Sequence, residues 1–355
     1  MRAKAILLCC LLLICVTACD SDKEQLEKTA SVTATTPNEE LKTETNTAWC
    51  ENGSEIVVQG RVNVSEMDFD TDSTDMVGVV PWYVKSERAK KMTIKKEVHL
   101  KWVESDLEKE MSNYDSNVSG CPLLTEIEVE EGNETLFSRD GMLFKYGKKK
   151  AKGLYACPVM KSGDISVPDN TIQIWSCAFN GCEEITSVFL PESIRGIGDA
   201  AFGNMKNCLK IDVSEDNPYY ESEDGVLYTK GKKVLIAYPA GKKDEIFQVP
   251  DGVEVIASGA FMCTNSLKKV ILPESVTQLC ESSFRQCESL QSIRAEGTIR
   301  YLDRFAFYKT IAQRDKFPKF SKREASSWRN WREELDKDFV KEDSVWIHGY
   351  RGLGI

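Results

Sequence analysis

The sequence of 355 residues contains only two histidines, His99 and His348, and they lie far apart in the chain. Histidine is the commonest metal ligand and the usual acid–base group near neutral pH, so its scarcity argues against most metal-dependent and acid–base mechanisms. The H-E-x-x-H, G-x-S-x-G and G-x-x-x-x-G-K-[ST] motifs do not occur either. We therefore expect no catalytic residues and no cofactor.

An excess of positive charge is also lacking. The chain has 46 Lys and Arg against 56 Asp and Glu, which gives a formal net charge of −10. A nucleic-acid groove needs a basic stripe to neutralise phosphates, so nucleic acid is not an expected partner. The apolar run at the N-terminus, Ile6–Val16, is short of the roughly 20 residues that span a bilayer.

That short run has the form of a targeting signal. Arg2 and Lys4 precede it, and its length suits the apolar part of a secretory signal peptide. The sequence VTAC that ends at Cys19 resembles the bacterial lipobox, whose cysteine receives a diacylglyceryl group and becomes the mature N-terminus. Two acyl chains give stable anchoring where one is marginal. We predict a signal peptide at residues 1–18 and a lipid anchor at Cys19; the alternative is an ordinary cleaved signal with a coincidental cysteine.

Residues 19–48 contain mostly Thr, Ser, Glu and Lys with almost no large apolar side chain. Such a segment cannot bury enough surface to offset its ordering entropy, which predicts a disordered tether. The localisation that follows is the extracytoplasmic face of a bacterial cell membrane.

A repeat of 23 residues explains the middle of the chain. It begins at Ile165 with ISVPDNTIQIWSCAFNGCEEITS and VFLPESIRGIGDAAFGNMKNCLK. It resumes at Phe247 with FQVPDGVEVIASGAFMCTNSLKK, VILPESVTQLCESSFRQCESLQS and IRAEGTIRYLDRFAFYKTIAQRD. Position 10 holds an aliphatic residue and position 15 a phenylalanine in every copy: Ile174, Ile197, Ile256, Leu279 and Leu302; Phe179, Phe202, Phe261, Phe284 and Phe307.

These columns predict a mainly β solenoid. The opening V-x-L pattern is a short strand with alternate side chains inward, and the proline at position 4 of the first four copies ends it. The aliphatic and phenylalanine columns supply further inward side chains. Because no single repeat can bury its own apolar face, neighbouring repeats must stack. We predict the solenoid over residues 119–315.

Two related segments interrupt the repeats. IEVEEGNETLFSRDGMLFKYGKKK begins at Ile127, and IDVSEDNPYYESEDGVLYTKGKKV begins at Ile211. Each contains an Asp-Gly pair, which is the strongest short signal for a hairpin turn. We predict β-meander inserts at residues 127–164 and 211–246, with Val226–Tyr228 and Val234–Ile236 as paired strands.

The phrases LPESI…IGDAAFGN and LPESV resemble the BspA-like leucine-rich repeats of bacterial and protist surface proteins. The insert pattern N-x3-[FY]-x-S-x-D-G-[VM]-L-[FY], which appears in looser form at Asn133 and Asn217, also recurs in that family. The resemblance covers about Gly120 to Asp315. It implies a right-handed, exported solenoid, often anchored to lipid or cell wall, and a role in binding rather than catalysis.

The flanks of the repeat region do not follow its pattern. Residues 49–118 contain an alternating stretch from Met92 to Trp102 and weaker strand candidates at 56–64 and 76–84, which predict either a small β-rich domain or an N-terminal cap. Residues 316–355 are predicted to form a C-terminal cap. Its helix, about residues 321–337, begins at a capping box and carries Trp328 and Trp331 at helical spacing.

Two short patterns invite a chemical interpretation. Asp68, Asp70 and Asp72 alternate and form a weak calcium candidate, but the glycine and glutamate of an EF-hand loop are missing, so a solvated acidic loop is favoured. Cys177 and Cys182 have C-x4-C spacing. Repeat packing is the favoured interpretation of this pair, a local disulfide comes second, and metal is third because two further ligands are lacking.

We expect a monomeric, non-catalytic surface lipoprotein that binds an extracellular protein or glycan. A structural or assembly component of the bacterial envelope is the alternative hypothesis. A remote third is an enzyme with its active site in residues 49–118.

Overall fold

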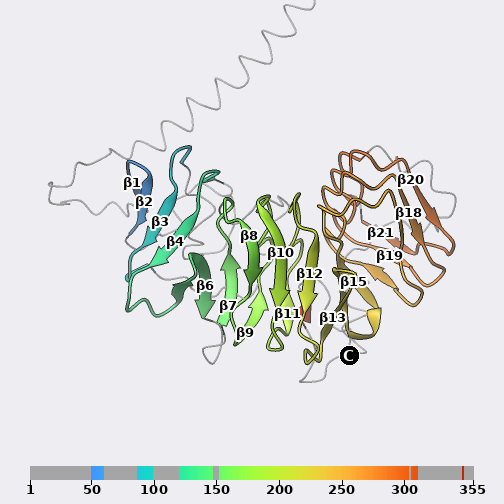
Figure 1. The fold of residues 1–355 in the computed structure, drawn as a ribbon, viewed down its shortest axis with the longest axis horizontal. Helices are drawn as coiled ribbons and strands as arrows, with labels where there is room; N and C mark the ends of the chain where they lie inside the picture. The colour runs from blue at the N-terminus through green and yellow to red at the C-terminus, as the bar shows by residue number, and fades with distance from the viewer. Residues whose placement is uncertain are drawn as a thin grey trace, which may run out of the picture.

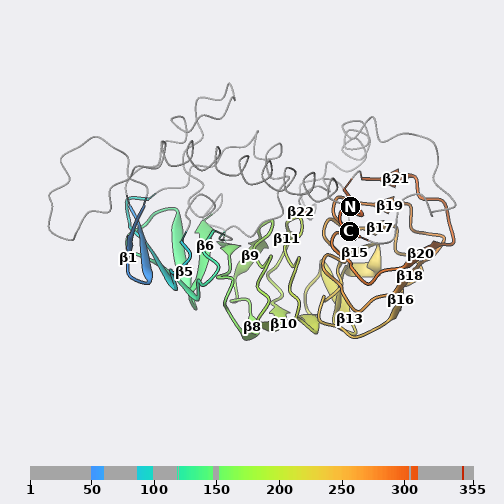
Figure 2. The same cartoon turned by 90° about the horizontal axis from the view of Figure 1, so that it is seen from above.

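The computed structural model describes residues 49–59, 86–98, 118, 120–146, 152–303, 305–310 and 346–347. These residues form short strands and one 3-10 turn, stacked side by side along one axis as a solenoid (Figure 1). Figure 2 shows that the stack is curved, with one row of strands along its convex side and a second row along its concave side. We call these rows the outer wall and the inner wall.

The outer wall consists of three parallel sheets, each with one strand from each of three successive turns. The first sheet also includes an antiparallel edge strand, β1 (Trp49–Asn52). The parallel strands are, in order, β2 (Glu55–Val58), β3 (Lys91–Ile94) and β4 (Glu126–Val129); β8 (Gly163–Ser166), β10 (Ile185–Leu190) and β12 (Lys210–Val213); β16 (Ile246–Gln248), β18 (Lys269–Leu272) and β20 (Ser292–Ala295).

Alternation along these strands divides core from surface. Val188 and Leu190 of β10 are buried, whereas Phe189 between them is 42% exposed. The period of two residues is what a sheet with one covered face requires. The V-x-L signal of the repeat is therefore the outer-wall strand, as the sequence predicts.

The inner wall contains the second strand of each repeat. Before the second insert these strands are β9 (Thr171–Ile174) and β11 (Gly196–Ile197), and after it β17 (Val255–Ile256), β19 (Gln278–Leu279) and β21 (Tyr301–Leu302). Position-10 residues are direct partners across the ladder: Ile174 pairs with Ile197, and Ile256 with Leu279. A further strand, β22 (Trp346–Ile347), pairs in parallel with β11.

The phenylalanines of position 15 stack from one turn to the next. Ring centroids are 5.5 Å apart between Phe179 and Phe202, and 4.8 Å apart between Phe261 and Phe284, with interplanar angles of 13° and 5°. Phe307 extends the second stack at 5.5 Å and is half-buried, as is Leu302, because they belong to the last described turn. Burial and stacking together make this column the centre of the core.

Each insert is a three-stranded antiparallel meander whose last strand joins the inner wall. The strands are β5 (Leu136–Arg139), β6 (Met142–Tyr146) and β7 (Lys152–Ala156) in the first, and β13 (Tyr220–Glu223), β14 (Val226–Thr229) and β15 (Val234–Ala237) in the second, with the 3-10 turn η3 (Lys230–Lys232) between β14 and β15. β7 pairs in parallel with β9, and β15 with β17. The predicted pairing around the Lys-Gly-Lys-Lys turn is confirmed.

The Asp-Gly pairs form the hairpin turns that the sequence predicts. Asp140 and Gly141 have φ values of 53° and 72°, and Asp224 and Gly225 have 50° and 74°. Both central residues of a type I′ turn need positive φ, which explains this residue choice. Each turn then lies against the outer wall, because the N–H of Ile211 donates to the Gly225 carbonyl at 2.9 Å and that of Ile127 to the Gly141 carbonyl at 2.8 Å. The turn thereby covers the edge of β4 or β12, which divides the outer wall into separate sheets.

The meander strands are buried on both faces. Every residue of β14 and β15 is buried. In β6, Leu143 packs with the N-terminal core around Ile56, whereas Phe144 packs with the main core around Phe179. A strand covered on both sides has no polar face, so VLYT and VLIA are almost continuously apolar. Each meander is a partition between two blocks of the solenoid.

The described part of the N-terminal region continues the solenoid. Ile56 of β2 lies opposite Met92 of β3, which lies opposite Ile127 of β4, all in parallel. This arrangement favours an extension of the outer wall over an independent β domain. The alternating pattern predicted from Met92 is seen in β3, which ends at Ile94.

Other predicted segments lie outside the described residues: the signal peptide, the tether, the strand candidate at 76–84 and the helix at about 321–337. The described residues contain no α-helix, so nothing supports the helical part of the predicted cap. No helix among them is long and apolar enough to cross a bilayer.

Candidate interaction surface

The conserved-looking residues of the inserts serve the fold. Asn217 is 1% exposed, and its Nδ2 donates to the carbonyls of Pro191 and Ile194 at 3.0 and 3.1 Å. Its Oδ1 accepts from the N–H groups of Tyr219 and Tyr220 at 2.8 and 2.9 Å. The asparagine therefore fastens the start of the meander to the proline turn of the preceding repeat.

Asn133 does the same in the first insert. Its Nδ2 donates to the carbonyls of Lys95 and Val98, and its Oδ1 accepts from the N–H groups of Thr135 and Leu136. Because both copies have all four bonds, the asparagine of the insert pattern has a structural role. It is not a candidate for ligand contact.

The cysteines that suggested chemistry belong to the repeat. Cys182 occupies position 18, and its Sγ lies 3.5 Å from the carbonyl oxygen of Pro158 in the preceding turn. Cys287 occupies the same position and donates to the Phe261 carbonyl at 2.9 Å. Thr310, also at position 18, donates to the Phe284 carbonyl. Position 18 thus holds a small donor that satisfies a carbonyl of the neighbouring turn.

Burial makes these thiols unreactive. Desolvation raises the pKa of Cys287 to about 12 and that of Cys208 to about 12. The thiolate is the form that binds metal and attacks electrophiles, so these thiols are inert in the folded chain at neutral pH. Among the described residues no group of three or more His, Cys, Asp or Glu is placed to hold a metal ion.

The exterior of the outer wall has exposed side chains that the repeat does not prescribe. Around β8 and β10, Thr186 and Ser187 donate to the Asp164 carboxylate at 2.8 and 2.6 Å, and these bonds, Ser187 first, lower the pKa of Asp164. On β12, Lys210 pairs with Asp212 at 2.7 Å. This part of the wall is a network of small polar and charged groups.

Large apolar side chains lie among those polar groups. Phe189 is 42% exposed, Leu209 is 52% exposed and Ile246 is 61% exposed. Phe189 stands on β10 between Ser166 and Asp212 in the register of the sheet. Leu209 immediately precedes β12, and Ile246 begins β16, so these two flank the second insert. We call Phe189, Leu209 and Ile246 the outer apolar set.

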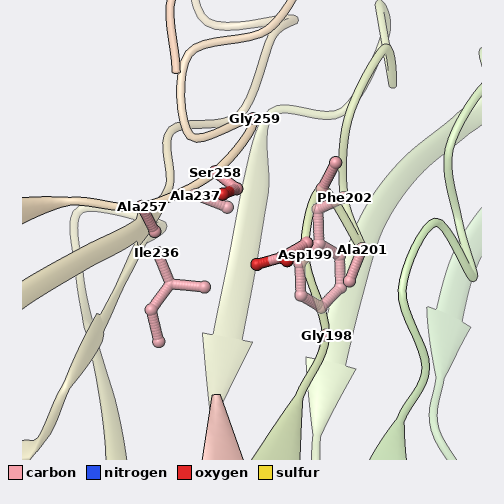
Figure 3. A pocket seen from close by; sticks show the side chains of 10 residues that line it. Gly198, Asp199, Ala201, Phe202, Ile236, Ala237, Ala257, Ser258 and Gly259 are labelled. Carbon is pink, nitrogen blue, oxygen red and sulfur yellow. The ribbon is translucent and has the colours of Figure 1, made fainter. Parts of the chain in front are cut away.

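A recess lies where the blocks before and after the second meander meet. Gly198, Asp199 and Phe202 line one side, and Ile236, Ala237 and Ala257 line the other (Figure 3). The N–H of Ala200 donates to the Ser258 carbonyl at 3.1 Å and joins the two blocks there. The recess has room for little more than one water molecule, so it is not a ligand pocket.

The predicted functional residues are not brought together in the described structure. Cys19 and the calcium candidates Asp68, Asp70 and Asp72 lie outside the described residues. The outer apolar set was missed at the sequence stage of reasoning because isolated apolar residues in a strand pattern are read as core. Its only signal was that Phe189 stands at position 2, out of phase with the inward positions 1 and 3.

Backbone strain in the repeat was also missed. Position 13 has positive φ at Cys177, Ala200, Gly259 and Ser282, and position 17 has it at Gly181, Asn204, Cys263, Gln286 and Lys309. A glycine in both columns would have signalled this, but each column has only one glycine. Stacking of the neighbouring turns holds the other residues in this unfavoured region.

A sequence profile described as "BspA type Leucine rich repeat region" matches residues 153–224 and 242–327 in six copies. No curated protein is similar enough to match the chain.

Solved structures of similar fold include three bacterial leucine-rich-repeat proteins. A leucine rich cell surface protein from Faecalibacterium prausnitzii A2-165 is 22% identical with a TM-score of 0.40, and the match covers 59% of this chain and 48% of that chain. A leucine-rich repeat protein from Eubacterium ventriosum ATCC 27560 is 19% identical with a TM-score of 0.38, covering 70% and 69%. The pneumococcal vaccine antigen PcpA is 17% identical with a TM-score of 0.40, covering 75% and 72%. This chain spans about half the length of the first of these.

Proposed function

Since the repeat region consists of BspA-type leucine-rich repeats, we propose that this chain is an exported, lipid-anchored surface protein without catalytic activity. It binds a partner protein through the exterior of the outer wall. The observation that carries this proposal is the outer apolar set, which is exposed on the convex side of a framework whose interior positions are all committed to packing.

Two features of that surface support a protein partner. Protein interfaces place apolar side chains at the centre and polar groups at the rim, and the outer apolar set is surrounded by such groups, including Asp164 and the Lys210–Asp212 pair. Two of the three apolar residues are aliphatic, whereas a sugar ring would stack best on planar aromatic side chains. A glycan ligand therefore remains the second choice for this surface.

The anchor is proposed from the N-terminal sequence. Cys19 would receive the diacylglyceryl group, and residues 19–48 would separate the solenoid from the membrane. Metabolic labelling with an alkyne-bearing palmitate analogue tests this part. We expect label on the wild-type chain and none on Cys19→Ala, which should also leave the membrane fraction. Equal labelling of both chains would refute the anchor without bearing on the binding surface.

The binding role is tested with the chain immobilised and exposed to a panel of matrix proteins, glycan arrays and whole cells. The test variant carries Phe189→Asp, Leu209→Asp and Ile246→Asp. The control carries Leu123→Asp and Met160→Asp, because these side chains are exposed to a similar degree, 41% and 40%, near the first insert.

We expect a signal from a protein in the panel that the test variant loses and the control retains. No signal above background across the panel would contradict a binding role, and equal binding by the test variant would contradict the proposed surface. Crosslinks on intact cells that reach only envelope components would favour a structural role instead.

A further inference from the structure

Two buried thiols meet at the boundary between the first meander and the first complete repeat. Cys157 and Cys182 are both 0% exposed. The Sγ atoms lie 3.7 and 3.5 Å, respectively, from the same atom, the carbonyl oxygen of Pro158. Cys182 Sγ also lies 3.7 Å from the Cys157 carbonyl oxygen. The two sulfur atoms therefore lie on the same side of one short segment of backbone.

The backbone holds both cysteines in place. Cys157 directly follows β7, and its N–H donates to the Ala178 carbonyl at 2.8 Å, which fixes the end of the meander on the turn that carries Phe179. Cys182 ends that same turn, where its N–H donates to the Phe179 carbonyl at 3.1 Å. A bond between the sulfurs would join the meander to the repeat it leads into.

The second meander shows that this boundary does not require cysteine. There the N–H of Tyr238 donates to the Ala260 carbonyl at 2.8 Å, the equivalent of the Cys157 bond. Position 18 of that repeat is Thr264, whose hydroxyl donates to the Phe261 carbonyl at 2.8 Å. Packing alone is thus satisfied by a tyrosine and a threonine, and the cysteine pair of the first boundary calls for a different explanation.

We propose that Cys157 and Cys182 form a disulfide in the mature protein and staple the first meander to the first repeat. The proposal rests on the export proposed above, because disulfides persist in oxidising compartments. The oxidant is a disulfide such as oxidised glutathione. One thiolate attacks it and releases one glutathione thiol, and the second thiolate attacks the mixed disulfide and releases the other. The protons of the two cysteines end on the two released thiols.

The pair is different from the C-x4-C spacing in the sequence. Cys177 packs in another cluster, with Ala200, Met262 and Cys263, on the side of the turn that faces the second block. Cys182 lies in the main core. The partner that the fold brings to Cys182 is therefore 25 residues upstream, and spacing along the chain would not identify it.

Timing follows from burial. Desolvation raises the pKa of the Cys157 thiol, and the neighbouring Cys182 adds to that effect. Thiolate is scarce in the folded, reduced chain, so exchange is fast only while the boundary is open during folding. Protein that has folded in the reduced state should react with oxidised glutathione much more slowly than protein that is refolding.

The test refolds the full chain from the reduced, unfolded state in a mixture of oxidised and reduced glutathione, followed by alkylation and digestion without reduction. We expect a linked peptide pair containing Cys157 and Cys182, lighter by two hydrogens than the separate peptides. Cys263 and Cys287 provide the internal control, because Cys263 is directed to Gln286 and Cys287 to the Phe261 carbonyl. Scrambled links among all the cysteines, or no link at Cys157, would overturn the proposal.

A stability measurement separates the staple from ordinary packing. The oxidised chain should unfold at a higher denaturant concentration than the reduced chain, and this difference should vanish in Cys182→Thr, which places at position 18 the residue that the next block has there. An equal difference in Cys182→Thr would contradict the assignment. In chain trapped by alkylation on intact cells, free thiols at both positions would overturn the claim for the mature protein, whereas the binding panel is unaffected by either result.

Discussion

Asn217 should be among the most sensitive polar side chains in the described part of the chain. Its four hydrogen bonds join two segments that have no other reason to stay together, and it is 1% exposed. Asn217→Ala removes all four. Pro191 keeps a second donor, the N–H of Ile194 at 3.3 Å, so three backbone groups lose a partner that the structure provides.

The magnitude follows from the cost of an unsatisfied buried group, about 1–3 kcal/mol each. Some relaxation and water entry will reduce the sum, and we expect Asn217→Ala to lower the free energy of unfolding by about 3–5 kcal/mol. Asn133→Ala removes the same four bonds at a half-buried site. Water can replace them there, so we expect about 1–2 kcal/mol.

Urea unfolding followed by intrinsic fluorescence measures both variants. Since blocks of a solenoid can unfold in separate steps, hydrogen exchange at the Tyr219 and Tyr220 amides should be measured as well, where the loss of protection must be local to the second insert. Asn217→Asp keeps the acceptors but loses the donors, so it should be destabilised at neutral pH and partly recover on acidification, which returns one donor.

The reasoning would be refuted if Asn217→Ala cost no more than Asn133→Ala. It would also fail if the Tyr219 and Tyr220 amides kept their protection in Asn217→Ala. Either result would mean that the asparagine does not fasten the meander to the preceding turn.

Three further outcomes are expected. Gly225→Ala should destabilise the chain by about 1–3 kcal/mol more than Gly141→Ala in urea unfolding, because both have positive φ but only at Gly225 would a Cβ lie 2.5 Å from a neighbouring side-chain atom; equal costs would contradict this. Phe284→Ala should cost about 3–5 kcal/mol and Phe307→Ala less than half of that, since Phe284 is stacked on both sides and Phe307 is half-buried. The thiol of Cys287 has a folded pKa raised to about 12 from a model value of 9.0, so its contribution to stability is present below about pH 9 and is lost as pH rises towards 12. Cys287→Thr should therefore lose less of its urea midpoint than wild type between about pH 8 and about pH 10, and an unchanged loss would rule out that thiol as a source.

Some elements could be derived from the sequence because their physical cause is local. The Asp-Gly pairs at 140–141 and 224–225 predict hairpins because positive φ at two successive residues admits few residue types. The strand around Val188 was predictable because its alternation has a period of two. The continuously apolar strands at 226–229 and 234–237 were also predictable, although their role as a partition was not, since a one-dimensional pattern does not say what covers each face.

The candidate surface and the cysteine pair could not be derived in that way. Phe189 and Ile246 are apolar residues whose exposure depends on which face of the strand is covered. Cys157 and Cys182 meet because the Cys157 N–H bonds to the Ala178 carbonyl, a contact between segments that the repeat alignment treats as unrelated.

The sequence by itself determined the repeat length, the two core columns, the sites of the inserts and the N-terminal signal. Each of these depends on the chemistry of single residues at a regular spacing. The tertiary structure decided which groups of different turns come together: the asparagine bonds to the preceding turn, the partition of the core by the meanders, the exposed set on the convex wall and the thiols at the Pro158 carbonyl. Stacking decides them, because the neighbours of a residue in a solenoid are one turn away in space but 23 or more residues away in sequence.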